Sequence, residues 1–384
     1  MSAAHDITWD EARRRASALA TRLPSEAVPL PDADRRVTTG ELTALVDLPG
    51  ADASAMDGWA VSGAPPWDVL SDDALDVSGA SELLAHQALP VVTGSRVPVG
   101  TTAILRSENA HVDSAGALRG QASEADIRRR AEECARGDVL VGDGVELTPP
   151  LLGLLAAAGH DTIDVTRPPR VRLVLVGDEL QDSGLPQGGR VRDALGPQLP
   201  AWLDRAGARV VDVRRIDDDK DDLVRALCAE GVDLVITTGG TAAGPRDHVH
   251  AATASVDGRF IVDGVAVRPG HPMVLAAVDG RPIVALPGNP QAAIVGLLTL
   301  AMPLIEAMLG RVVPPETRVR LDESLNSPDG ITRLVGGVLG TDGFRRSTHA
   351  GAAMLRGLAA STGYAVVPPG GAAPGETVRW LPLA

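Results

Sequence analysis

The stretch VRLVLVG at residues 171–177 decides the fold, because a nearly continuous apolar run of this length is typical of a buried parallel strand. Further strands are predicted at VDLVITTGG (232–240) and RPIVALPG (281–288), with helical segments of about a dozen residues between successive strands. The last strand leads into a long apolar helix over residues 290–309. Strands that alternate with helices predict a doubly wound α/β domain, which we place at residues 170–311.

The rest of the chain has other patterns. Residues 7–22 carry apolar side chains at helical spacing, and Thr8 is the predicted N-cap. Over residues 37–145, short β-leaning runs alternate with Gly, Pro and Asp turns, which indicates a mainly β region. Residues 148–160 have the pattern of a helix, and residues 312–384 have that of a small all-β domain. The chain is therefore predicted to be a multidomain α/β and β protein.

The composition excludes several classes of protein. With 44% hydrophobic and 22% charged residues, the chain can form globular cores, and its net charge of −14 argues against general nucleic-acid binding. Two cysteines, Cys134 and Cys228, are too few for a disulfide framework or a cysteine-rich zinc site. The N-terminus lacks the apolar core of a secretory signal, and the most apolar stretch, residues 292–305, is too short to span a bilayer. We expect a cytoplasmic protein without a membrane segment.

Three loops that follow strands of the predicted sheet indicate a ligand site. They cover residues 177–180, 239–244 and 287–290. Ligands of open α/β sheets collect at the carboxyl ends of the strands, where glycines let backbone N–H groups approach a phosphate and a helix N-terminus favours an anion. Glu179 in the first loop and Asp247 just beyond the second could hold a divalent cation between their oxygens.

Several of these residues also fit a purely structural role. Asn289 and Pro290 make a good N-cap and first helical residue, so helix capping alone would explain them. Asp57, within the string SAMDGWAV, fits a tight turn as well as a functional carboxylate. The run Arg128–Arg130 fits a solvated helix face or, in so acidic a protein, a phosphate clamp. The convergence of three loops after three strands of one sheet favours a site.

Seven motifs stand in a fixed order along the chain. They are SAMDGWAV (54–61), VVTGSRVPVGTTAILRSEN (91–109), DIRRRAEE (126–133), GDELQ (177–181), TTGGTAAGPRDHVH (237–250), VRPGHP (267–272) and PGNP (287–290). In this order they closely resemble the MoeA family of molybdopterin molybdenumtransferases, whose eukaryotic relative is the gephyrin E domain. The resemblance covers nearly the whole chain, and SAMDG and PGNP at this separation are specific to it.

The resemblance implies an elongated homodimer with four domains per chain. The implied parts are an N-terminal helix that packs on the α/β domain (1–22), a split linker domain I (23–46 and 146–169), a β-rich inserted domain II (47–145), a molybdopterin-binding, MogA-like α/β domain III (170–311) and a small C-terminal β-barrel domain IV (312–384).

The resemblance also implies an enzyme of molybdenum cofactor biosynthesis, a magnesium-dependent molybdopterin molybdenumtransferase. The family inserts molybdate into adenylylated molybdopterin and releases AMP, which leaves molybdenum on the dithiolene. The implied substrates are molybdopterin adenylate and molybdate, and the implied cation is Mg²⁺. A molybdopterin adenylyltransferase would be the upstream donor of the substrate, and the homodimer would share its active site between subunits.

The resemblance assigns roles to residues in and around the three loops. Glu179 and Asp247 would be the metal-binding and catalytic carboxylates, and Asp57 and Thr93 would reach the same site from the partner subunit. The residues that would bind the pterin phosphate and molybdate are Gly239, Gly240, Thr241, Gly244, Asp218, Arg268, His271, Pro287, Gly288, Asn289 and Pro290.

Several positions depart from the family pattern near the implied molybdate site. Arg268 and His271 replace the lysines of a K-P-G-K-P motif, and a histidine is mostly neutral at pH 7. Glu133 stands where the family usually has Asp, and Ala352 stands where it commonly has Ser. These changes leave an alternative open, in which the chain is a catalytically weakened paralogue that binds molybdopterin or its adenylate as a carrier or scaffold.

Overall fold

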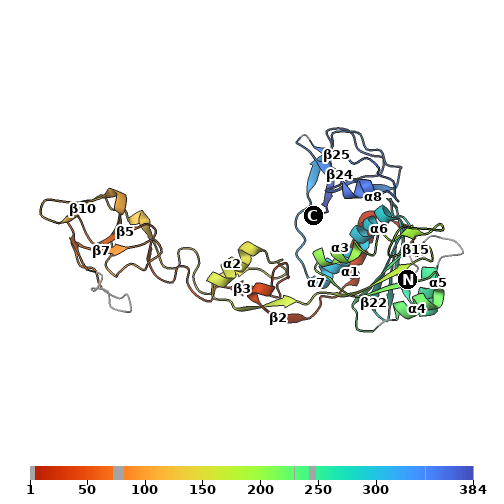
Figure 1. Ribbon diagram of the computed structural model, residues 1–384, viewed down its shortest axis with the longest axis horizontal. Coiled ribbons are helices and arrows are strands. Elements are labelled where there is room, and N and C mark those ends of the chain that lie inside the picture. The colour runs from red at the N-terminus through yellow and green to blue at the C-terminus, as the bar shows by residue number, and fades with distance from the viewer. Residues whose placement is uncertain (1–4, 72–81, 229, 242–247, 342, 384) are drawn as a thin grey trace.

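The computed structural model describes the chain except for residues 1–4, 72–81, 229, 242–247, 342 and 384. The molecule is elongated (Figure 1). A β-rich region lies at one end, a small region around α2 (Pro149–Ala157) lies in the middle, and an α/β unit lies at the other end beside the C-terminal region. The chain leaves the α/β unit, runs out to the β-rich region and returns, so this inserted region is held far from the α/β unit.

The α/β unit is built on a seven-stranded mixed sheet with the order β1–β19–β21–β22–β18–β14–β17. The strands are β1 (His5–Ile7), β14 (Arg170–Val176), β17 (Arg209–Ile216), β18 (Leu234–Thr238), β19 (Arg259–Val265), β21 (Val274–Val278) and β22 (Arg281–Leu286). β17, β14, β18 and β22 are parallel, whereas β21 runs antiparallel to both of its neighbours. The three strands that precede the predicted ligand loops, β14, β18 and β22, are therefore neighbours.

Helices cover both faces of this sheet. Alternate side chains of β14 enter two hydrophobic cores, one with α1, α3, α6 and α7 and the other with α4 and α5. The helices are α1 (Trp9–Leu19), α3 (Leu199–Arg205), α4 (Lys220–Leu227), α5 (His248–Ser255), α6 (Pro290–Gly296) and α7 (Met302–Leu309). Burial on both faces explains why the β14 sequence is nearly all apolar, and its one polar interruption, Arg172, pairs with Asp212 at 2.9 Å.

Two helix starts show how local hydrogen bonds set the boundaries. α1 begins at the predicted cap, where the Glu11 N–H donates to Thr8 Oγ1 at 3.3 Å. α3 has only seven residues, fewer than the dozen expected, and begins late. The Asp193 carboxylate accepts hydrogen bonds from the N–H groups of Leu195 and Gly196, at 2.9 and 2.8 Å, and holds this segment in a turn before the helix.

A continuous helix over Pro290–Leu309 consists of α6, a π-helical turn (Leu297–Ala301) and α7. Within the described residues, this is the one helix that is long and apolar enough to cross a membrane, so the prediction that the stretch is too short was wrong. However, 83% of its most apolar window is buried inside the protein, as expected of a core helix. Trp9 Nε1–H donates to Thr299 Oγ1 at 2.9 Å and fixes α1 against this helix.

The middle region forms from two segments that flank the inserted region in sequence. β2 (Ser25–Pro29) pairs with β13 (Thr162–Thr166), and β3 (Leu42–Thr43) pairs with β12 (Val139–Val141), both antiparallel. These strands, a 3₁₀ turn (Leu30–Asp32) and α2 surround a shared apolar core. The structure thus brings the two segments together, and the four domain boundaries themselves remain a prediction.

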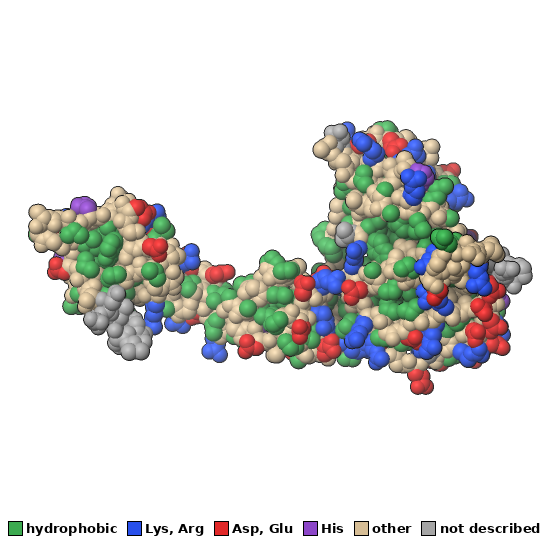
Figure 2. Space-filling model, viewed as in Figure 1, with side chains coloured by type: hydrophobic (Ala, Val, Ile, Leu, Met, Phe, Trp, Pro, Cys, Tyr) green, Lys and Arg blue, Asp and Glu red, His purple; other side chains and the backbone are tan. Residues whose placement is uncertain are grey.

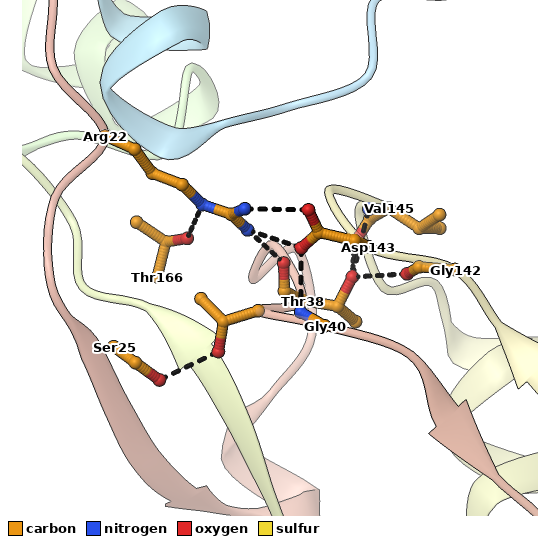
Figure 3. A network of polar contacts seen from close by, with 9 residues as sticks. Arg22, Ser25, Thr38, Gly40, Gly142, Asp143, Val145 and Thr166 are labelled. Carbon is orange, nitrogen blue, oxygen red and sulfur yellow. Dashed lines mark hydrogen bonds and ion pairs between the residues drawn. The ribbon is translucent and has the colours of Figure 1, made fainter.

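A polar network joins the middle region to the end of α1 (Figure 3). Arg22 binds both carboxylate oxygens of Asp143 at 2.9 Å and also donates to the Thr38 carbonyl at 2.6 Å and to Thr166 Oγ1 at 3.3 Å. The Asp143 carboxylate accepts a further bond from the Gly40 N–H at 2.7 Å. The Arg22 guanidinium lowers the pKa of Asp143 to about 2.

The inserted region is built from strands and turns, as predicted, and contains no α-helix among its described residues. A four-stranded sheet with the order β6–β7–β5–β8 carries a small apolar cluster on each face. The elements are β4 (Ala53–Ser54), β5 (Gly58–Val61), β6 (Asp68–Val69), β7 (Gln87–Val91), β8 (Ala103–Arg106), β9 (Ala110–Val112), β10 (Leu118–Gly120), β11 (Ile127–Arg128) and 3₁₀ turns at Ser107–Asn109 and Glu124–Asp126.

The C-terminal region is a β-sheet with one short helix. Its order is β20–β24–β26–β27–β23, with β25 on β24, and β20 comes from the α/β unit. The elements are β20 (Val267–Arg268), β23 (Arg318–Arg320), β24 (Thr332–Leu339), β25 (Phe344–Arg346), α8 (Leu355–Ala359), β26 (Gly363–Val367) and β27 (Thr377–Pro382). A single bridge from Leu321 to Phe344 joins the two ends of the sheet, so the closed barrel remains a prediction.

Candidate functional site

The three predicted loops meet around one cavity of about 840 Å³ at the carboxyl ends of β14, β18 and β22. Its charged lining residues are Glu179, Arg192, Asp193 and Asp218. The predicted lining residues that the structure places there are Glu179, Asp218, Gly239, Gly240, Thr241, Pro287, Gly288, Asn289 and Pro290. The prediction that loops after neighbouring strands form one site is therefore consistent with the cavity's position.

Glu179 enters the cavity from the turn after β14. Gly177 has φ +148°, and a Cβ there would lie 2.7 Å from the Glu179 carboxylate, so the carboxylate folds back over a position that only glycine fits comfortably. Two predicted residues, Asp247 and Gly244, lie outside the described residues. No cluster of three metal-ligating side chains occurs in the part of the chain that the structure describes, so the Glu179–Asp247 cation site remains a prediction.

Two further carboxylates near Glu179, those of Asp178 and Asp193, have different structural roles. Asp178 Oδ1 accepts a hydrogen bond from the Asp218 N–H at 2.8 Å, which holds the loop after β17 against the loop after β14 and brings Asp218 to the cavity. Asp193 is buried, and its Oδ2 accepts a bond from Arg215 at 3.1 Å, while its Oδ1 caps the turn before α3. Asp193 is therefore a structural part of the cavity wall.

The glycine-rich loop and the start of α6 present backbone to the cavity. Gly239 has φ +85°, and a Cβ there would lie 2.8 Å from the Val176 carbonyl oxygen, which requires glycine. Asn289 occupies the N-cap position of α6, but its side chain makes no capping hydrogen bond and instead lines the cavity. This placement favours a ligand role for Asn289 over the capping role that its sequence position also allowed.

A second, smaller cavity of about 280 Å³ is lined by two arginines, Arg268 and Arg333. The remaining lining residues are Pro269, Leu334, Val335, Gly336, Ala350 and Ala352. Pro272 and Ala353, which follow closely on these residues in the chain, line the main cavity. The same two loops therefore supply walls to both cavities, and two guanidinium groups make the smaller one suited to an oxyanion.

His271, which the resemblance assigns to binding, does not line either cavity. Its Nε2 lies 2.7 Å from Asp6 Oδ1, where β1 meets the loop after β20. Arg333 and Arg192 are the arginines of the two cavities that sequence reasoning missed. Neither belongs to a motif, and only their places on β24 and β16 (Val191–Arg192), the strand paired with β15 (Leu180–Gln181), bring them to the site.

Asp57 and Thr93 contact each other at the far end of the molecule. Asp57 Oδ1 accepts hydrogen bonds from the Thr93 N–H at 2.7 Å and from Thr93 Oγ1 at 2.9 Å, and the N–H bond in particular lowers the pKa of the Asp57 carboxyl. They stand beside β5 and β7, in the inserted region, which Figure 1 shows at the opposite end from the α/β unit. Within one chain, they do not reach the cavity.

The arginine run lies on β11 and the turn after it, so the expected helix face was wrong. Arg129 pairs with Asp52 at 2.9 Å and with Glu124 at 2.8 Å, and Arg130 pairs with Asp47 at 2.6 Å. These carboxylates belong to the same end of the molecule. Arg129 and Arg130 therefore stabilise the inserted region through ion pairs, and their geometry does not support a phosphate clamp.

Two family models match this chain, one over its N-terminal part and one over the α/β unit. Residues 7–159 match the family model "MoeA N-terminal region (domain I and II)", and residues 172–307 match the model "Probable molybdopterin binding domain". Molybdopterin molybdenumtransferase 2 of Mycobacterium tuberculosis H37Rv is 37% identical over 79% of this chain and 80% of its own length. The Haemophilus influenzae molybdopterin molybdenumtransferase is 30% identical over 79% of this chain and 78% of its own.

The fold agrees with a solved structure over almost its whole length. The MoeA protein from Pyrococcus horikoshii OT3 superposes with a TM-score of 0.78 at 20% identity and covers 98% of this chain and 100% of its own. Fold and cavity thus define a multidomain protein organised around an α/β domain of the molybdopterin-binding class. The chain belongs to the MoeA family of molybdopterin molybdenumtransferases.

Proposed function

We propose that this protein is a transferase of molybdenum cofactor biosynthesis that inserts molybdate into adenylylated molybdopterin and releases AMP. The observation that carries the proposal is the pair of adjoining cavities. A large one offers backbone and carboxylates at the carboxyl ends of three strands, and a small one offers two arginines. The names of the curated relatives support the same activity.

The large cavity suits the phosphorylated pterin. The loop of Gly239 and Gly240 and the Pro287–Pro290 loop before α6 line the cavity at the end of a parallel sheet, which is a favourable place for phosphate oxygens. Arg192 adds a positive charge from β16. The site can therefore bind a pyrophosphate-bearing ligand although the protein as a whole is strongly acidic.

The small cavity suits molybdate, a compact dianion. Arg268 and Arg333 supply two permanently charged guanidinium groups within a volume of about 280 Å³. Neither the His271 ring nor a hydroxyl at Ala352 contributes, so these two arginines carry the electrostatic attraction. The shared walls place the oxyanion next to the pterin, as transfer between them requires.

Magnesium fits the main cavity by donor chemistry. Glu179 and Asp218 offer carboxylate oxygens there, the ligand type that Mg²⁺ prefers, and Asp247 is the further candidate. Bound at this place, the cation would offset the charge of the pyrophosphate during its hydrolysis. The role of Glu179 is to hold that cation at the phosphoanhydride.

The remaining parts of the proposal concern assembly. We propose a cytoplasmic homodimer in which Asp57 and Thr93 of one copy complete the cavity of the other, because the inserted region holds them far from their own cavity. A molybdopterin adenylyltransferase would supply the substrate, since the adenylate must form before it can be cleaved.

The experiment incubates the protein anaerobically with adenylylated molybdopterin and Mg²⁺, with and without molybdate, and follows AMP and pterin-bound molybdenum. We expect AMP release to depend on molybdate and to match the molybdenum retained on the pterin. Tight pterin binding without AMP release would contradict the proposal and indicate a carrier instead.

A further inference from the structure

The first turn of α6 holds a buried amide side chain that the proposed chemistry does not use. Gln291 follows Asn289 and Pro290 of the third ligand loop and is only 2% exposed. Its Nε2 donates hydrogen bonds to the Met354 carbonyl at 2.7 Å and to the His349 carbonyl at 3.3 Å. Burying a polar side chain is favourable only when such partners satisfy it, so this position is built for an amide donor.

Gln291 binds across the boundary between the α/β unit and the C-terminal region. Besides the two side-chain bonds, its backbone N–H donates to the Ala352 carbonyl at 2.9 Å. All three acceptors lie in residues 349–354, which we call the wall loop. α6 thus holds the wall loop at three points along six residues.

The wall loop forms part of both cavities. Ala350 and Ala352 line the small cavity that contains Arg268 and Arg333, which we call the arginine cavity. Ala353 and the adjoining Leu355 line the main cavity. His349, at its start, has φ +59°, a left-handed conformation that is costly for a residue with a side chain. Contacts from outside the loop are needed to hold such a conformation, and the Gln291 amide supplies one to the His349 carbonyl itself.

The opposite wall of the arginine cavity rests on the same helical turn. A Cβ at Gly270, in the loop that carries Arg268, would lie only 3.1 Å from the Ala292 carbonyl oxygen, so this loop packs directly on α6. The first turn of α6 therefore supports both the Arg268 loop and the wall loop. Their separation, and hence the shape of the arginine cavity, depends on this turn.

We infer that Gln291 is a positioning residue that fixes the wall loop on α6 and thereby sets the affinity of the arginine cavity for its oxyanion. The inference rests on the proposed function, because the oxyanion is taken to be molybdate. Gln291 does not touch the substrate. Its loss should weaken molybdate binding more than pterin binding, because most of the main cavity, including Glu179 and the glycine-rich loop, is built from other elements.

The test compares three variants of the full-length protein. Gln291→Met keeps the length of the side chain but removes both donors, and Gln291→Glu replaces the donors with acceptors that face two carbonyls. Gln87→Met is the control, since the Gln87 side chain accepts a bond from the Leu84 N–H at 2.9 Å in the distant inserted region. Each variant is measured by hydrogen exchange of peptides spanning residues 348–356 and by the KM for molybdate and for adenylylated molybdopterin.

We expect both Gln291 variants to speed exchange in the wall loop and to raise the KM for molybdate about tenfold, equivalent to about 1.4 kcal/mol, with a smaller rise in the pterin KM. The control should leave all three quantities as in the wild type. Unchanged exchange in the wall loop would overturn the inference, and so would faster exchange with an unaltered molybdate KM.

The exchange measurement needs no catalysis, so it separates this inference from the proposed function. Should the wild type fail to release AMP, the molybdate KM is replaced by equilibrium binding of molybdate alone, measured by calorimetry on the same variants. Weaker binding in both Gln291 variants would still support the positioning role, and equal binding would overturn it.

Discussion

The cavity of the α/β unit and the Asp57–Thr93 pair of the inserted region are two parts of one predicted site that differ in construction. The cavity is formed by backbone loops at the ends of three buried, neighbouring strands, so its shape follows from the sheet. The pair is exposed, lies on a small separate sheet and stands at the other end of the molecule. A rigid sheet can pre-form a binding site within one chain, whereas the distant Asp57–Thr93 pair can contribute to such a site only in a second chain.

The contrast extends to charge. Figure 2 shows acidic and basic side chains interspersed over the visible face of the α/β unit, with apolar side chains exposed along the middle and inserted regions. In the inserted region, several arginines are engaged by neighbouring carboxylates, as Arg129 and Arg130 are. In the small cavity, Arg268 and Arg333 line a shared space, and Arg333 also donates a hydrogen bond to the Asn326 carbonyl at 2.9 Å. Ion-paired arginines occur at both ends of the molecule, as Arg172 and Arg215 show in the α/β unit, and the two arginines of the small cavity differ from them in lining a space that a ligand can enter.

The largest expected effect is at Glu179. Glu179→Gln removes the charge that would hold the cation, and we expect AMP release to fall by at least about a hundredfold with folding unchanged. Single-turnover assays measure AMP release, and circular dichroism measures folding. Glu41→Gln, an exposed change in the middle region, is the control. Retained turnover in Glu179→Gln would show that the cavity chemistry lies elsewhere.

A smaller effect is expected at Arg333. Arg333→Ala removes one of two guanidinium groups in the small cavity, and the KM for molybdate should rise on the order of 10- to 100-fold because charged hydrogen bonds are lost. Steady-state AMP release at varied molybdate gives the KM. Arg345→Ala, which removes an exposed charge from the same sheet, should have no such effect. Equal KM values for the two variants would contradict the assignment of the small cavity to molybdate.

His271 should matter less than its motif position suggests. Its ring contacts Asp6 outside both cavities, so His271→Ala should change the molybdate KM by no more than about twofold, within the usual range of surface substitutions. The same titration of molybdate applies. A rise comparable to that of Arg333→Ala would mean that the loop turns His271 into the cavity when substrate binds.

The smallest expected effect is at the junction between the middle region and the end of α1, where Arg22 pairs with Asp143. Because Arg22 lowers the folded-state pKa of Asp143 to about 2, from its ordinary value of 3.8, this pair stabilises the fold above pH 3.8 and loses its contribution as pH falls towards 2. The pair is partly exposed, so its worth is below about 1 kcal/mol. Thermal unfolding should show Asp143→Asn slightly less stable than wild type at pH 6, with the difference vanishing near pH 2. A constant difference across this range would contradict the assignment.

The sequence predicted the part of the site that follows from regular sheet geometry. Parallel strands end at one edge, so the loops after β14, β18 and β22 could be brought together from their patterns alone. Arg333 and Gln291 could not be found this way. Arg333 reaches its cavity through the packing of the C-terminal sheet, and Gln291 is buried by contacts with a loop about 60 residues away, as loop closure allows at small cost.

Motif position does not determine the orientation of a side chain where tertiary contacts decide it. His271 was assigned with its motif, but an aspartate from the first strand pairs with its ring. The late start of α3 depends on one buried carboxylate, Asp193, whose partners include Arg215 on another strand. Neither interaction leaves a periodic signal in the sequence.

The most direct test of the account mixes two inactive variants. Asp57→Asn and Glu179→Gln proteins are each expected to release little AMP alone. After co-refolding in equal amounts, half of the dimers are mixed and each carries one intact site, so about a quarter of the wild-type activity should return. That recovery would show that the cavity of one chain uses Asp57 of the other. No recovery, with one variant labelled with nitrogen-15 so that mass spectrometry demonstrates the mixed dimers, would contradict the shared site.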